Sequence, residues 1–107
     1  MSESQWTDAA PLDEVPAEDV IGKVVAGREI ALYSVDGGIY ATDNLCTHGH
    51  ARLCEGFLDG HEIECPLHQG SFHIPTGKCL KPPARLDLKT YPIRIEGGHI
   101  YVGLPVV

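Results

Sequence analysis

At 107 residues the chain is long enough for one domain with a modest core and too short for two. Fifteen acidic and eight basic residues give a net charge of −7, which argues against nucleic-acid binding because that affinity depends on Lys and Arg neutralising phosphates. No apolar run is long enough to cross a membrane and no signal-peptide pattern opens the chain, so we expect a cytoplasmic protein without membrane contact.

The N-terminal part of the chain is predicted to be β-structure after a short irregular opening. A strand around Trp6 is followed by a stretch in which Pro16 limits any helix to one turn. Val, Ile and Tyr are then enriched between glycine turns, which is typical of antiparallel hairpins. This pattern predicts strands at residues 23–26, 29–35 and 39–42, with turns at Gly27-Arg28 and Asp36-Gly37-Gly38.

The C-terminal part is predicted to contain a long loop and then further short strands. Residues 43–60 have little periodicity and are expected to be loop. Beyond them, β-patterned runs are separated by Gly and Pro, and they predict strands at residues 61–64, 71–74, 79–80, 90–96 and 99–104. We therefore predict an all-β fold, an antiparallel β-sandwich or barrel formed by residues 1–107 as a single domain.

The most informative feature is a pair of Cys/His motifs inside the loop-rich region. Cys46-Thr47-His48 is followed, after sixteen residues, by Cys65-Pro66-Leu67-His68. In a protein without a secretory signal, Cys spaced close to His is more often a metal site than a disulfide. The two motifs predict a metal site in a subdomain inserted at roughly residues 43–84.

Thiolate and imidazole together suit zinc, iron or copper rather than calcium or magnesium. A structural zinc site usually has a pair of cysteines followed by a pair of histidines, whereas here each motif mixes the two. A copper site would use a methionine, and the only one is Met1. In a Rieske-type [2Fe–2S] cluster one iron takes two Cys and the other two His, which explains the mixed motifs.

The ligand set has a consequence for the reduction potential. Two ferric ions, two sulfides and two thiolates carry no net charge together, whereas a cluster with four thiolates is a dianion. Adding an electron to the neutral cluster costs less free energy, so its potential lies higher, at about −150 to +300 mV.

The sequence resembles the Rieske ferredoxins, and in particular those of bacterial aromatic-ring-hydroxylating dioxygenases of the naphthalene type. The resemblance covers most of the chain. It rests on residues 46–51 and 65–72, on Glu55-Gly56 between them, on Thr76-Gly77, and on the flanks 41–45 and 89–92.

The resemblance implies one Rieske [2Fe–2S] cluster, with Cys46 and Cys65 on the buried iron and His48 and His68 on the outer one. His50 is the alternative to His48, although the Cys-x-His spacing favours His48. It also implies that a third loop at Pro82-Pro83 covers the cluster.

The resemblance further implies a one-electron carrier rather than an enzyme. It would pass electrons from a flavin-dependent ferredoxin reductase to a terminal Rieske oxygenase, and we expect it to be a monomer. The alternatives are a Rieske-like small subunit of another oxidoreductase such as nitrite reductase, and a zinc-stabilised interaction module. The sequence does not identify the oxygenase or its aromatic substrate.

Two departures from the high-potential respiratory relatives affect the expected potential. Ala51 and Leu67 stand where those relatives have an additional disulfide, and Gly70 and Phe72 stand where they have hydroxyl donors. Fewer donors to sulfur stabilise the reduced cluster less, so we expect a potential at the low end of the Rieske range. Cys54 and Cys79 are expected to be thiols outside the ligand set.

Overall fold

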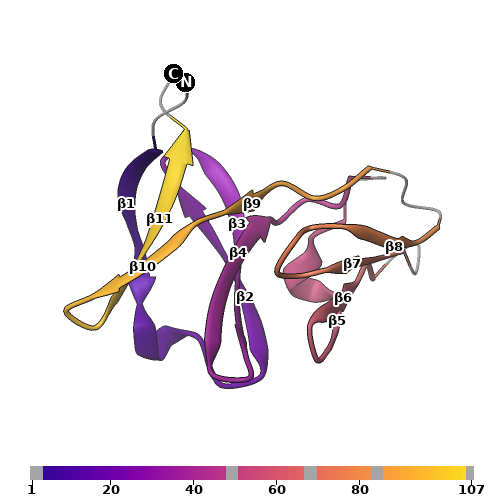
Figure 1. Cartoon of the computed structure of the whole chain (residues 1–107), viewed down its shortest axis with the longest axis horizontal. Coiled ribbons are helices and arrows are strands. Elements are labelled where there is room, and N and C mark those ends of the chain that lie inside the picture. Colours follow the sequence, from indigo (N-terminus) through magenta and orange to yellow (C-terminus); the bar gives the residue numbers. More distant parts are fainter. Residues whose placement is uncertain (1–3, 48–50, 67–69, 83–85, 106–107) are drawn as a thin grey trace.

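The computed structural model describes residues 4–47, 51–66, 70–82 and 86–105 (Figure 1). These residues form eleven strands and two short 3₁₀ helices, at Leu12–Glu14 and Leu53–Glu55. None of the described helices is long and apolar enough to cross a membrane. The strands are β1 (Ser4–Pro11), β2 (Asp19–Val25), β3 (Arg28–Val35), β4 (Gly38–Asp43), β5 (Phe57–Asp59), β6 (Glu62–Glu64), β7 (Ser71–His73), β8 (Cys79–Lys81), β9 (Thr90–Tyr91), β10 (Ile93–Glu96) and β11 (His99–Pro105).

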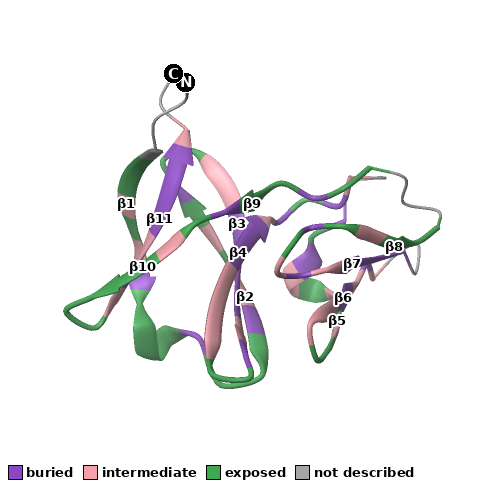
Figure 2. Ribbon diagram, in the orientation of Figure 1, coloured by how far each residue is buried: buried purple, intermediate pink, exposed green. Residues whose placement is uncertain are grey.

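The strands form three antiparallel sheets, which confirms the predicted all-β class. Their orders are β1-β11-β10, β2-β3-β4-β9 and β5-β6-β7-β8. The first two sheets enclose an apolar core to which β3 contributes Ile30 and Leu32 and β11 contributes Ile100 and Val102. Figure 2 shows buried residues along β11, whereas the turn between β10 and β11 is exposed.

Tight turns set the register of the hairpins. Ala26 and Gly27 both have positive φ, as do Asp36 and Gly37, and this matches two-residue turns whose twist suits a hairpin. The first turn therefore lies at Ala26-Gly27, one residue before the predicted position, and Arg28 already belongs to β3. Gly38, expected in the second turn, begins β4.

Pro92 divides the segment that was expected to be one strand over residues 90–96. Proline has no N–H for a ladder hydrogen bond, so the strand is interrupted there. Before it, Tyr91 pairs with Ala41 of β4, and after it, Ile93 pairs with Val102 of β11. The interruption lets one run of chain join two different sheets.

The third sheet packs on the second through its own apolar core. This core joins Tyr33 and Val35 of β3 to Ile63 of β6 and Phe72 of β7. Strand β5 was not expected, because residues 43–60 were predicted to be loop, and it pairs with β6 across Gly60. The single-domain interpretation and the boundaries of the inserted subdomain, roughly residues 43–84, remain proposals.

Because the two cores are separate, we predict that the free energy of unfolding can be changed without changing the metal site. Leu32→Ala removes a fully buried side chain from the core between the first two sheets, and we expect unfolding to become easier by about 2–5 kcal/mol. The visible absorption spectrum of the purified protein should not change. Val24→Ala, on a side chain that is 71% exposed, is the control and should change stability by less than about 0.5 kcal/mol. Equal losses in thermal denaturation of the two variants would contradict the assignment of this core.

Candidate metal centre

The first ligand loop follows directly from the end of β4. Leu45 forms an isolated antiparallel bridge with Arg52, and the Cys46 N–H donates to the carbonyl of Ala51 at 2.9 Å. Cys46 is 4% exposed. The loop is therefore closed at its base with the thiol directed into the protein.

The second ligand loop connects β6 to β7. Glu64 pairs with Ser71 in the ladder, and the Cys65 N–H donates to the carbonyl of Gly70 at 2.7 Å. Cys65 has no exposed surface. Both loops are thus closed by the same bond, from the cysteine N–H to the carbonyl five residues later.

His48, His50 and His68 lie outside the described residues, so the choice of imidazole ligands stays a prediction. In the sequence, His48 and His68 each fall within one of the two closed loops. The first loop therefore combines one buried thiol with two histidines nearby in the chain, and the second combines one buried thiol with one histidine.

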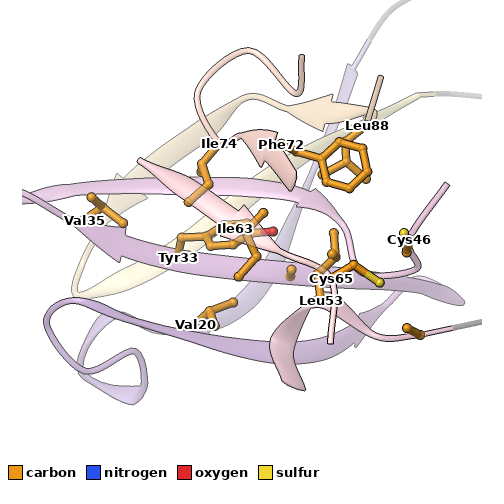
Figure 3. Close-up of a cluster of buried hydrophobic side chains, with 12 residues drawn as sticks. Val20, Tyr33, Val35, Cys46, Leu53, Ile63, Cys65, Phe72, Ile74 and Leu88 are labelled. Atoms are coloured by element: carbon orange, nitrogen blue, oxygen red, sulfur yellow. The ribbon is translucent and has the colours of Figure 1, made fainter. Parts of the chain in front are cut away.

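The two cysteines belong to one buried cluster, formed between β3 and the third sheet. They lie at the same end of this cluster, next to Leu53, while Val35 lies at the other end (Figure 3). No disulfide joins the cysteines to one another or to Cys54 or Cys79. The described part of the chain contains no group of three or more His, Cys, Asp or Glu side chains that could complete a metal site by itself.

This donor set fits an iron–sulfur cluster. Thiolates are soft ligands, and a dry apolar surrounding is typical of the sites that hold iron and sulfide. Residues 48–50 and 67–69, which belong to the two loops in the sequence, lie outside the described residues.

A third segment packs against the first loop. The Thr47 hydroxyl donates to the carbonyl of Leu86 at 2.9 Å, and the Asp87 carboxylate accepts from the Cys79 N–H at 2.8 Å. Pro82 is exposed at a turn after β8, and Pro83 lies outside the described residues. Residues 86–87 are therefore held beside the loop that carries Cys46.

Two glycines allow the backbone to approach closely around the loops. A Cβ on Gly56 would lie 2.1 Å from the carbonyl oxygen of Glu64, which directly precedes Cys65. A Cβ on Gly77, whose φ is +75°, would lie 2.2 Å from the carbonyl oxygen of Leu88. Only glycine fits at either position, and both belong to the short motifs that the sequence pointed out.

Tyr33 of β3 and Tyr91 of β9 lie beside the end of β4, and both stay uncharged at neutral pH. Burial raises the pKa of Tyr33, whose hydroxyl is paired with that of Thr42 at 2.8 Å. Burial and the neighbouring Asp43 carboxylate raise the pKa of Tyr91 to about 12. Neither phenol therefore adds negative charge next to the first ligand loop.

Several cysteines and histidines outside the two ligand loops make ordinary structural contacts. Cys54 and Cys79 are half-buried thiols, as expected. The ring of His61 packs edge-on against Tyr40, and Nδ1 of His73 pairs with the Thr76 hydroxyl at 2.9 Å. The sequence reasoning gave no role to Asn44, which is buried beside the first loop. An Asn directly after a strand is a weak signal, since it is equally common in turns.

Comparison with known proteins agrees with this geometry. The model of the Rieske [2Fe-2S] domain matches residues 5–92. The chain therefore belongs to the Rieske [2Fe–2S] family, and its cofactor is a Rieske-type [2Fe–2S] cluster.

Individual relatives show which kind of Rieske protein this chain resembles. The chain is 64% identical over 95 residues to the ferredoxin component of the naphthalene 1,2-dioxygenase/salicylate 5-hydroxylase systems of Ralstonia sp, covering 89% of this chain and 91% of that protein. Among solved structures it is similar to a ferredoxin of Sphingomonas yanoikuyae B1, with a TM-score of 0.89, 38% identity, and coverage of 94% and 100%. It is also similar to a chain in a complex of reduced oxygenase and oxidized ferredoxin of carbazole 1,9a-dioxygenase, with a TM-score of 0.84, 33% identity, and coverage of 92% of both chains.

These similarities confirm the predicted family, its all-β fold and its cofactor. The chain is a ferredoxin component of a dioxygenase system, an electron carrier rather than an enzyme. The zinc-module interpretation is thereby excluded.

The tight contact at Gly56 yields a test of the loop geometry. In Gly56→Ala the new Cβ must displace the Glu64 carbonyl, and the second ligand loop with it, so we expect the iron content per protein to fall by half or more. Gly60→Asn is the control, because a Cβ there meets nothing within 4 Å and Asn tolerates positive φ. Iron and sulfide analysis of the two purified variants makes the comparison, and equal iron content in both would contradict this account.

Proposed function

We propose that this chain accepts single electrons from a flavin-dependent ferredoxin reductase and delivers them to a terminal Rieske oxygenase acting on an aromatic ring. The observation that supports this most directly is the pair of closed loops, each burying one cysteine at the same end of one core. The Ralstonia relative is named as a component of naphthalene 1,2-dioxygenase and salicylate 5-hydroxylase systems, and we propose a related aromatic substrate for the system that this chain serves.

We assign the cluster ligands as Cys46 and Cys65 for one iron and His48 and His68 for the other. When bound, the cluster supplies a centre that takes up and releases one electron. The two cysteines fix its position because their loops are closed by backbone hydrogen bonds. The surrounding side chains keep water from the thiolate side, since Leu53 and Phe72 are fully buried.

Two exposed apolar side chains adjoin the ligand loops and suit transient docking. Leu45 precedes Cys46 and is 41% exposed, and Leu86 is 67% exposed on the segment bonded to Thr47. Because the first ligand loop and this segment share a surface, a partner that covers them would approach the cluster. The chain's net charge of −7 would steer it toward a partner with a basic face.

The histidine assignment is tested by two neighbouring substitutions. His48→Ala should abolish the cluster and its colour, because one iron loses a ligand. His50→Ala is the matched control and should keep the red-brown oxidised form, with an EPR signal of low average g-value after dithionite reduction. The opposite pattern, a coloured His48→Ala protein and a colourless His50→Ala protein, would transfer the ligand role to His50.

The electron-carrier role is tested by turnover of a reconstituted system. With a naphthalene-type terminal oxygenase and its reductase, product formation should require the wild-type chain. Leu86→Ser should lower the second-order rate of oxygenase reduction several-fold, because about 1–2 kcal/mol of apolar contact is lost, while the midpoint potential stays constant.

Ile95→Ser is the control for docking. Ile95 is 42% exposed on β10, whose sheet does not carry the ligand loops, and its loss should leave the rate of reduction unchanged. A wild-type chain that fails to support turnover with any dioxygenase partner would overturn the proposal itself.

A further inference from the structure

The same kind of backbone hydrogen bond closes both ligand loops, but different strand pairing supports the two loops at their bases. Cys65 directly follows β6, and the β6–β7 ladder pairs Glu64 with Ser71 immediately outside the closing bond. At the first loop, β4 has already ended at Asp43, and the pairing outside the closing bond consists of the isolated bridge between Leu45 and Arg52 with the bond from the Leu53 N–H to the Asn44 carbonyl. The first loop therefore lacks the ladder that holds the second.

Asn44 occupies the position where that ladder would continue. It is 3% exposed, and both its backbone groups are bonded: its N–H donates to the Glu29 carbonyl at 3.0 Å, and its carbonyl accepts from the Leu53 N–H at 2.7 Å. Its side chain adds two bonds to one residue. Oδ1 accepts from the Cys54 N–H at 2.9 Å, and Nδ2 donates to the Cys54 sulfur at 3.3 Å.

The β2 strand packs directly on this pair. A Cβ on Gly22 would lie 2.8 Å from the Cys54 sulfur and 2.9 Å from Nδ2 of Asn44. The Asn44–Cys54 pair is thus enclosed between β2 and the two ends of the first ligand loop, and its amide cannot rotate freely.

We propose that Asn44 is the positioning residue of the first ligand loop. Asn44 lies two residues before Cys46, and its side chain bonds to Cys54, which lies three residues after Ala51. These bonds tie the two ends of the loop together and thereby fix the direction in which the Cys46 thiol points. This inference rests on the proposed ligand role of Cys46. Asn44 touches no reacting atom in this account; it acts through the loop.

The direct test removes both hydrogen bonds between the Asn44 side chain and Cys54. In Asn44→Ala the Cys54 N–H loses its acceptor, and we expect the cluster to be lost to an iron chelator about 10-fold faster than in the wild type, as for the removal of residues that orient metal ligands. The EPR spectrum of the remaining reduced cluster should broaden, because the ligand geometry becomes variable.

A matched variant separates positioning from general stability. Thr42→Val also removes a buried side-chain hydrogen bond near the end of β4, to Tyr33, but it leaves the Asn44–Cys54 pair intact. It should lower the melting temperature while the chelation rate stays within twofold of the wild type and the EPR spectrum is unchanged. Equal acceleration of cluster loss in Asn44→Ala and Thr42→Val would overturn the inference.

A conservative pair of substitutions provides rescue and covers the case in which Asn44→Ala does not fold. Asn44→Asp keeps an acceptor for the Cys54 N–H, whereas the side chain of Asn44→Ser is too short to reach it. We expect Asn44→Asp to retain the cluster at least threefold longer than Asn44→Ser. Equal retention in the two would overturn the inference.

The EPR signal of the wild-type protein distinguishes failure of the inference about Asn44 from failure of the proposed function. A wild type without a Rieske EPR signal would contradict the ligand assignment itself. A wild type with that signal, beside an Asn44→Ala variant of unchanged spectrum and chelation rate, would contradict only the role of Asn44.

Discussion

Two backbone hydrogen bonds, from the Cys46 N–H to the Ala51 carbonyl and from the Cys65 N–H to the Gly70 carbonyl, set the positions of the two thiol ligands. Each closes a short loop on itself, and the cysteine at its start is buried. A loop of this kind has few internal contacts, and the entropy of ordering it must be offset by the structure beneath. The third sheet and its core with β3 provide that base.

The surroundings of the loops also bear on the expected electron affinity. Phe72 is fully buried in the cluster that contains both cysteines, and neither it nor Gly70 carries a side-chain donor. The neighbouring tyrosines are neutral, because burial raises the pKa of Tyr33 and of Tyr91. Since neither Phe72 nor Gly70 can donate a side-chain hydrogen bond to sulfur, we expect the added electron to be stabilised less than in relatives that have hydroxyl groups at these positions.

Much of the fold could be predicted because its signals are local. The turns at Asp36-Gly37 and Gly97-Gly98 need positive φ at both positions, and glycine supplies it at low cost. By contrast, β5 has only three residues, and it forms because β6 is available to pair with it. The predicted strand over residues 90–96 ran through Pro92, and the change of sheet there depends on the tertiary positions of β4 and β11. The cysteines were identified by spacing, whereas the position of Asn44 depends on contacts across ten residues that no pattern records.

The two apolar cores separate the packing of the first two sheets from the packing around the ligand loops. One core lies between the first two sheets and contains none of the ligand loops, so it can set the folding free energy without constraining the cluster. The other core includes both cysteines, so the thiol ligands belong to a closely packed part of the protein. Electron transfer is fast when little has to rearrange, and the exposed side chains Leu45 and Leu86, which we propose as docking contacts, lie outside both cores. Substitutions at these two exposed positions can therefore alter docking without changing the packing of either core.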